Sequence, residues 1–391
     1  MRDKRKAYTS ISIIIILIAV ALIVFITTAQ PAGVIHVPGS EPLRILPDLE
    51  VDRYWIVNGR GGLILLTEDQ PGSWSYRTFP IGRVIDATGP DSSGRLYCSF
   101  WEDITPMGVY VFDCASETVV DTIYLDYIPR GLVLSPDETK LYVAAWVWPQ
   151  PGEPFAWDVT PEHPDSGIVL EIDLATKGVI RSATTAAMPE IIHYSDCPGS
   201  DRLLISTHEM LVLVAEGEIP DTLGGAATLD MIDIGSFSRL EPRIQGPFPF
   251  EYHSNYLLDW PLGGCYVAVC FPYPVYARGY PEYQNAIWII DPAGNEVVRT
   301  LRITDPNGVS AGIFSAVISA VHEDEVYVSL GQIDTEMDQA ILVIDADSGE
   351  TIRSIDVGGE GWPSFLHETP DGRLIACCAA TSKILIIDPE P

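Results

Sequence analysis

A short phrase that returns along the chain constrains its fold more than any other feature. The copy "ILVIDADSGETIRSIDVGG" (341–359) has an apolar, β-branched run, a turn of Asp, Ser and Gly, and a second run in which apolar residues stand among polar ones. This pattern predicts a strand, a tight turn and another strand. The turn aspartates recur at spacings of 60, 60, 58, 54 and 43 residues, at Asp113, Asp173, Asp233, Asp291, Asp345 and Asp388. Such a period indicates a repeat architecture.

A second hairpin pattern precedes each copy of the phrase. Examples are "GLVLSPDETKLYVAAW" (131–146) and "SFLHETPDGRLIACCA" (364–379). One unit is therefore four short strands, here called a, b, c and d, and four antiparallel strands per unit of about 40 residues form the blade of a β-propeller. Seven units begin near Leu43, Val84, Gly131, Ile191, Tyr256, Ala316 and Ser364. We predict an all-β, seven-bladed propeller of four-stranded antiparallel blades over residues 34–391.

The last unit lacks one strand, because the chain stops soon after "KILIID" (383–388). The sequence Gly-Val-Ile-His-Val, which begins at Gly33, is an apolar strand just ahead of the first blade. We expect it to complete the seventh blade. This closure removes a free sheet edge, which an all-β chain must otherwise protect.

The paired hairpins resemble the YVTN-type β-propeller repeats of archaeal and bacterial surface proteins. "SPDETKLYVA" and "IDADSGETIRSIDVG" carry the likeness, and "LYVAAW" and "VYVSLG" stand where that family has Tyr-Val-Thr-Asn. No copy here has Thr-Asn after Tyr-Val. The resemblance covers about residues 84–391 and implies the propeller fold and a surface-protein scaffold, but a fold does not determine a function.

The amino terminus has a different character. A basic leader (1–7) precedes a charge-free apolar segment (8–29), and residues 30–33 form a linker. The segment is long enough to cross a bilayer as a helix, for which about 20 residues are needed. Its basic flank should stay in the cytoplasm, which places the propeller outside the cell. A secretory signal cut after Ala29 is an alternative, and so is a leader similar to that of prepilins, cut after Ala7, in a filament subunit.

Charge excludes one class of partner. The first seven residues hold four basic residues and one acidic residue, so the rest of the chain carries 19 Lys and Arg against 53 Asp and Glu. This excess argues against binding nucleic acid or an anionic lipid surface. The predicted contact with a membrane is through the helix alone.

Seven cysteines are present and no Cys-x-x-Cys pair. We place Cys98, Cys265 and Cys377 in strand b as packed thiols, because free cysteine is among the most buried residue types. Cys114 and Cys197 both lie near turns, and the hypothesis that one of them forms a disulfide stays open.

Three histidines and several acidic turns are weighed as metal sites. His193 and His367 occupy one register of strand a, and His253 stands at the entry to another; strand a lines the central channel, where imidazoles can hold a metal. The favoured interpretation is that these histidines are ordinary side chains of the inner strands and bind no metal. Acidic turns such as "DADSGE" lack the calcium-loop spacing. We expect no metal, no cofactor and no catalytic residue, since the familiar hydrolase and nucleotide-binding motifs are absent.

Long insertions gather on one face. They are the b–c connections 146–167, 216–230 and 271–286 of blades three to five and the d–a connection 246–256. These segments are rich in proline and aromatic residues, which suit protein or glycan recognition. The alternative is that the rings bury against each other. The predicted binding residues are Trp146, Trp148, Phe155, Trp157, Tyr252, His253, Tyr273, Tyr276, Tyr280 and Tyr283.

These features together predict a membrane-anchored, surface-exposed propeller that binds a protein or glycan or builds the cell envelope. Two alternatives stay open. One is a pilin-like filament subunit with a propeller head. The other is a secreted propeller enzyme, such as a lactonase or a dehydrogenase subunit.

Overall fold

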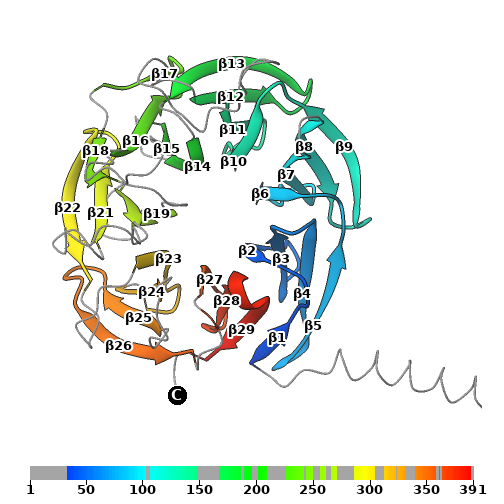
Figure 1. Cartoon of the computed structure of the whole chain (residues 1–391), viewed down its shortest axis with the longest axis vertical. Coiled ribbons are helices and arrows are strands. Elements are labelled where there is room, and N and C mark those ends of the chain that lie inside the picture. Colours follow the sequence, from blue (N-terminus) through cyan, green and yellow to red (C-terminus); the bar gives the residue numbers. More distant parts are fainter. Residues whose placement is uncertain are drawn as a thin grey trace, which may run out of the picture.

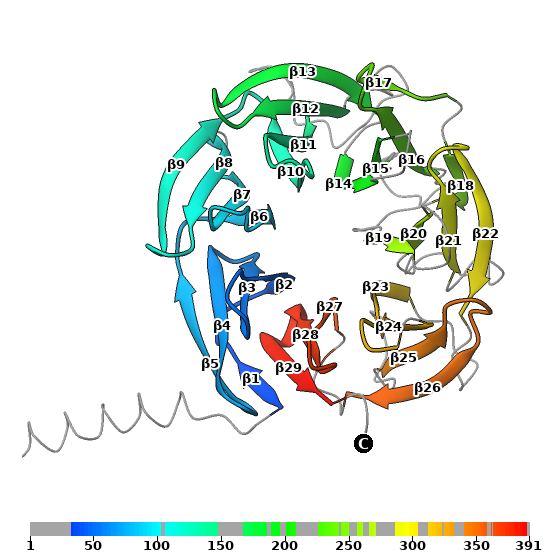
Figure 2. The same ribbon diagram turned by 180° about the vertical axis from the view of Figure 1, so that it is seen from behind.

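The repeated hairpins form seven antiparallel sheets around a central opening, as the sequence predicts (Figure 1). In this computed structural model strand a of each blade lies nearest the centre and strand d at the rim (Figures 1 and 2). The structure describes residues 33–102, 106–147, 167–185, 189–195, 201–208, 226–241, 244–249, 256–260, 266–270, 286–303, 312–322, 324–331, 340–357, 361 and 363–388.

The first three blades are regular four-stranded sheets. Blade one has β2 (Pro42–Pro47), β3 (Arg53–Asn58), β4 (Leu63–Gln70) and β5 (Ser73–Phe79). Blade two has β6 (Val84–Thr88), β7 (Arg95–Trp101), β8 (Met107–Asp113) and β9 (Thr118–Tyr124). Blade three has β10 (Ile128–Leu134), β11 (Lys140–Trp146), β12 (Gly167–Asp173) and β13 (Gly178–Thr185).

The next three blades follow the same order with one change. Blade four has β14 (Pro189–Ser195), β15 (Arg202–His208), β16 (Ala226–Asp233), β17 (Ser238–Arg239) and β18 (Ile244–Pro249). Blade five has β19 (Tyr256–Trp260), β20 (Tyr266–Cys270), β21 (Ala286–Asp291) and β22 (Glu296–Arg302). Blade six has β23 (Gly312–Ile318), β24 (Glu325–Gly331), β25 (Ala340–Asp345) and β26 (Thr351–Asp356).

Blade seven is completed from the other end of the chain. It has β27 (Phe365–Glu368), β28 (Leu374–Cys378), the short 3₁₀ helix η2 (Ala379–Thr381) and β29 (Lys383–Ile387), and β1 (Val34–His36) pairs with β29. The pairing is antiparallel, with Ile35 opposite Ile384. The predicted closure by the Gly-Val-Ile-His-Val segment is confirmed.

The hydrophobic core is divided among the spaces between neighbouring blades. Between blades one and two, for example, Trp55 packs against Phe112 with ring centroids 5.1 Å apart, and Cys98 belongs to the same buried cluster. Each blade buries the apolar residues of both sheet faces, which explains why a chain of this length needs no single large core.

The turn aspartates cap their own hairpins. Oδ1 of Asp113 accepts hydrogen bonds from the backbone N–H and the hydroxyl of Ser116, each at 2.7 Å, and Asp173 and Asp345 bind Thr176 and Ser348 in the same way. These bonds lower the pKa of the Asp113, Asp173 and Asp345 carboxyl groups. The repeated aspartate is therefore a turn residue, because its side chain replaces a backbone acceptor.

Blade four departs from the predicted boundaries. Its outer edge is split, since β17 and β18 both pair with β16. Residues 226–230, which we predicted in a loop, lie in strand c, and residues 246–249, which we predicted in the d–a connection, lie in the outer strand. The structure describes no helix long and apolar enough to span a membrane, and the predicted leader and apolar segment lie outside the described residues.

An ion pair joins blade seven, which contains the closure, to blade one. The Arg373 guanidinium binds both carboxylate oxygens of Glu68, at 2.7 and 2.6 Å, and lies over the Trp74 ring at 5.3 Å. The hydrogen bonds from Arg373 hold the pKa of Glu68 below its ordinary value. Bidentate pairs of this kind are among the strongest side-chain hydrogen bonds.

We expect Glu68→Gln to lower the free energy of unfolding at pH 7 by about 1–3 kcal/mol. A carboxyl group whose pKa is depressed by folding stabilises the protein above its unfolded pKa, which is about 4.3, and this contribution is lost as the pH falls through the folded pKa. Urea unfolding at pH 7 and pH 3 measures the difference. Asp347→Asn, in an exposed pair with Arg299, is the control. An equal loss at both pH values would contradict the prediction.

Candidate functional site

Two tryptophans end strand b of neighbouring blades at the same register. Trp101 is the last residue of β7 and Trp146 the last residue of β11. Each ring lies against a guanidinium, Trp101 under Arg83 at 5.7 Å and Trp146 under Arg130 at 4.5 Å. Strand b leads into the b–c connection, so both pairs lie on the face from which the long insertions leave.

Trp146 is held from both sides. Its indole N–H donates to the Pro189 carbonyl at 3.1 Å, across the space between blades three and four. Arg130 in turn binds the Glu190 carboxylate through Nε at 2.8 Å. A ring with a fixed N–H bond and a cation on its face has few alternative orientations, so the pair offers a rigid, partly exposed surface.

Charged residues of strand a link consecutive blades around the central opening. Arg44 binds Oδ1 of Asp86 at 2.6 Å, and Oδ2 of Asp86 accepts the Leu132 N–H at 3.0 Å. The Arg130–Glu190 pair repeats this link between blades three and four. The pairing register of strand a shifts beside each of the four residues, which indicates bulges. Bulges re-aim side chains, and here they accompany the charged residues that join strand a of one blade to strand a of the next.

Sequence reasoning missed this set of residues. The sequence does contain a signal for these residues. A charged residue stands within the otherwise apolar strand a of one blade, and a residue of opposite charge stands at the matching position of the next blade. All four charged side chains are paired, so the pairs stiffen the ring formed by the strands a. None of the four is an unpaired carboxylate that could act as a general base.

The two channel histidines that the structure describes belong to blades four and seven. His367 packs against the Tyr54 ring, with centroids 5.4 Å apart, and burial lowers its pKa to about 4. His193 lies in β14 of blade four, and His253 lies outside the described residues. No cluster of three or more potential metal ligands occurs within the described ranges.

The carboxylates of the acidic turns accept hydrogen bonds from donors of the same hairpin. Asp91 of "GPDSSG" (89–94) accepts bonds from Ser93 and from the backbone of Arg95 through Oδ1, and from the Tyr97 hydroxyl at 2.9 Å through Oδ2. Its carboxylate is thus already coordinated within the hairpin.

The structure describes the side chains of Cys98, Cys114, Cys377 and Cys378, and each is a buried thiol outside any disulfide. Burial raises the pKa of Cys98 and Cys377, so these thiols are poor nucleophiles. The placement of Cys98 and Cys377 in strand b is confirmed. Cys114 is not in a disulfide, while Cys197 and Cys265 lie outside the described residues.

Of the ten predicted binding residues, Trp146 alone falls within the described ranges. The structure places it at the start of the blade-three insertion, and the bonds to Arg130 and Pro189 were not expected. The other nine lie outside these ranges: Trp148, Phe155, Trp157, Tyr252, His253, Tyr273, Tyr276, Tyr280 and Tyr283. Their role as a binding surface stays a prediction.

Comparison with known proteins supports the fold. No protein-family model matches the chain, and no curated protein does. Among solved structures, a chain of "Kuenenia stuttgartiensis Hydrazine Synthase" is similar, with a TM-score of 0.65 and 17% sequence identity over 91% of this chain and 97% of that chain. At this identity the similarity shows a shared fold and nothing about activity.

Proposed function

We propose that this chain is a binding module whose b–c face recognises a protein or glycan at the cell surface. The observation that carries the proposal is the matched pair of Arg–Trp stacks at the ends of β7 and β11. The stacks stand at the base of the face where the insertions leave, and they extend the predicted aromatic surface from blades three to five into blade two.

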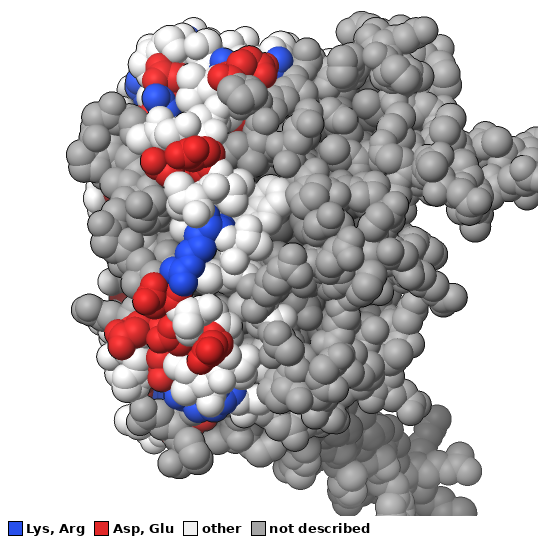
Figure 3. Space-filling view, turned by 90° about the vertical axis from the view of Figure 1, so that its left-hand side faces the viewer, with Lys and Arg blue, Asp and Glu red and all other residues white. Residues whose placement is uncertain are grey.

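Physical chemistry favours binding over catalysis at this face. Aromatic rings give large contact areas with few rotatable bonds, and an adjacent guanidinium supplies hydrogen bonds that suit hydroxyl and carbonyl oxygens. The strong acidic excess makes an uncharged or basic partner more suitable than a polyanion. Carboxylates gather in patches on the side of the ring shown in Figure 3, with a short basic stripe between them.

The proposal includes the location of the module. The apolar segment (8–29) would anchor the chain, with the basic leader inside the cell and the propeller outside. Protease protection of the full-length chain in intact cells tests this orientation. Digestion of the propeller from the outside, with the leader protected, is the expected result.

Binding is tested with glycan arrays and with the surface proteins of the host cell, followed by affinity measurements on each hit. Replacement of residues 149–165 by a short Gly-Ser turn should leave the propeller folded and abolish binding. Trp146→Ala should weaken binding at least about tenfold, a loss that one central aromatic residue can cause.

Asp137→Asn is the matched control, because Asp137 lies in an a–b turn on the opposite face, where it binds its neighbours Ser135 and Thr139. We expect unchanged binding for this variant. Full binding after the loop replacement would refute the proposed face. Unfolding after the replacement would show that the aromatic residues of the insertion belong to the local core.

A further inference from the structure

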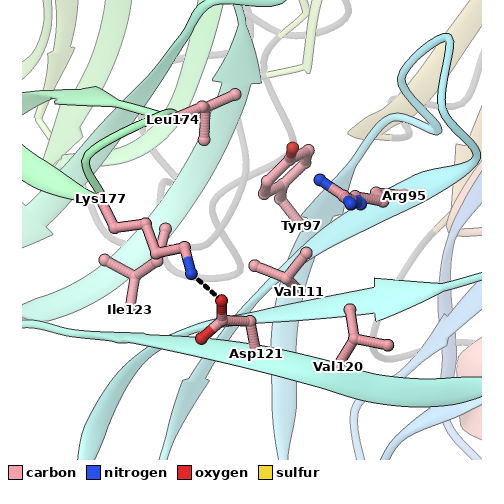
Figure 4. Close-up of a pocket in the computed structure, with 8 residues that line it drawn as sticks. All are labelled: Arg95, Tyr97, Val111, Val120, Asp121, Ile123, Leu174 and Lys177. Carbon is pink, nitrogen blue, oxygen red and sulfur yellow. Dashed lines mark hydrogen bonds and ion pairs between the residues drawn. The ribbon is translucent and has the colours of Figure 1, made fainter.

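A pocket of about 210 Å³ opens between blades two and three, on the side of the a–b and c–d turns and therefore away from the tryptophans. Val111, Val120, Ile123 and Leu174 supply its apolar surface (Figure 4). The Arg95 guanidinium and the Lys177 ammonium enter from opposite sides, and Asp121 lies below Lys177 (Figure 4). We name this feature the blade two–three pocket.

Arg95 differs from its counterparts in the other blades. A basic residue begins strand b in blades one to four and directly precedes it in blade seven. The four counterparts are in ion pairs: Arg53 with Asp48, Lys140 with Glu171, Arg202 with Asp233 and Arg373 with Glu68. The exposed Arg95 side chain forms no hydrogen bond or ion pair with any residue that the structure describes, although Asp113 stands opposite it in the strand register.

The positions of the basic and acidic residues at the rim are also exchanged between strand d of blade two and the c–d turn of blade three. In blades one, three and five an arginine of strand d meets the c–d turn of the next blade, in the contacts Arg77–Glu117, Arg181–Phe237 and Arg299–Asp347. In blade two this strand carries Asp121, and the turn offers Lys177. The hydrogen bond from Lys177, and to a lesser extent the charge of Arg95, lowers the pKa of Asp121. Asp121 is thus engaged by Lys177, and the Arg95 guanidinium keeps its donors available.

We propose that the blade two–three pocket binds a small ligand in which one carboxylate is attached to a compact, branched apolar group. The carboxylate forms two parallel hydrogen bonds with Arg95, the geometry that guanidinium and carboxylate share. The apolar group packs on Val111, Val120, Ile123 and Leu174. The volume is below the roughly 300–1,000 Å³ of sites for drug-sized ligands, so the group is short.

Two sources provide this chemistry, a free short-chain acid and the C-terminal residue of a peptide. A phosphate group fits less well than a carboxylate, because its additional negative charge is not neutralised by one guanidinium and increases the repulsion from Asp121. The pocket is independent of the proposed b–c face, since the two lie on opposite sides of the ring.

The test uses the full-length chain in a mild detergent, with labelled Val, Leu and Ile methyl groups observed by NMR. The probes are 4-methylpentanoate, its neutral amide, acetate, the peptide Gly-Gly-Leu and its C-terminal amide. We expect saturable shifts of the Val111, Ile123 and Leu174 methyl signals with a Kd on the order of 1 mM for the first probe. Arg95→Gln should weaken this binding at least about tenfold, and Arg95→Lys should weaken it less.

Arg299→Gln is the matched control at the rim contact between blades five and six and should change the Kd less than about twofold. Methyl signals away from the pocket report whether each variant is folded. Tighter binding of 4-methylpentanoate assigns the free acid as the ligand, and tighter binding of Gly-Gly-Leu assigns a peptide terminus. The proposal is wrong if neither acid shifts these signals, if acetate or the amides bind as well as the acids, or if a folded Arg95→Gln variant binds like the wild type.

Discussion

Replacing Val34–Val37 by Gly-Ser-Gly-Ser should lower the free energy of unfolding by on the order of 5 kcal/mol, because it removes the strand that closes the ring. Ile35 and Val37 are 4% and 2% exposed, and full burial of such a side chain is worth about 1.5–3 kcal/mol. The backbone bonds Val37 N–H to Ser382 O and Ile386 N–H to Gly33 O frame the closure. The expected loss is a large fraction of the roughly 5–15 kcal/mol by which proteins are stable.

The replacement should also expose the edge of β29, and an exposed edge strand promotes self-association. Urea unfolding measures the first effect and light scattering the second. Val51→Ser is the control, since Val51 is 75% exposed and surface substitutions usually change stability by less than about 0.5 kcal/mol. If the replaced protein unfolds at the wild-type urea concentration, β1 does not hold the ring closed.

Acidification should destabilise the propeller through His367 in a pH window above that of the carboxyl groups whose pKa folding lowers, such as Glu68. Burial lowers the pKa of His367 to about 4, whereas an unfolded histidine titrates near 6.5. The folded state therefore binds fewer protons than the unfolded state between these values. Stability is unaffected by this group above about pH 6.5, declines as the pH falls, and has lost about 3 kcal/mol by pH 4.

A His367→Gln variant should lack this part of the pH dependence, whatever its stability at pH 8. The measurement is the free energy of unfolding from pH 8 to pH 4.5. His36→Gln, at a position exposed on β1, is the matched control and should keep the wild-type slope. An unchanged slope in the His367 variant would show that folding does not lower the pKa of this imidazole.

The number and order of the blades followed from the sequence alone. The Asp-Ser-Gly and Pro-Asp turns recur with fixed apolar runs on both sides, and local turn chemistry together with strand patterning is enough to predict a hairpin. The missing strand of the last unit and the apolar segment before the first predicted the closure for the same reason. The blade-four boundaries were wrong because its outer edge is made of two separate strands, β17 and β18, and propensity does not indicate such a division.

Contacts between blades needed the tertiary structure. Asp86 and Leu132 are 46 residues apart in the chain, and Arg130 and Glu190, which also pair across a blade interface, are 60 residues apart. The repeat period told us which residues share a register, but the bulges of strand a decide which side chains turn into the channel. Bulges depend on the pairing of two strands and leave little trace in one of them.

The sequence by itself determined the repeat, the seven blades, the closing strand and the face that carries the long insertions, because each depends on residues close together in the chain or on their period. The tertiary structure decided that Trp101 and Trp146 are braced by arginines, that His367 is buried against Tyr54, and that Arg95 lacks the ion pair of its counterparts. These properties arise where one blade meets the next, and the energy of a side chain there depends on neighbours that the local sequence does not specify.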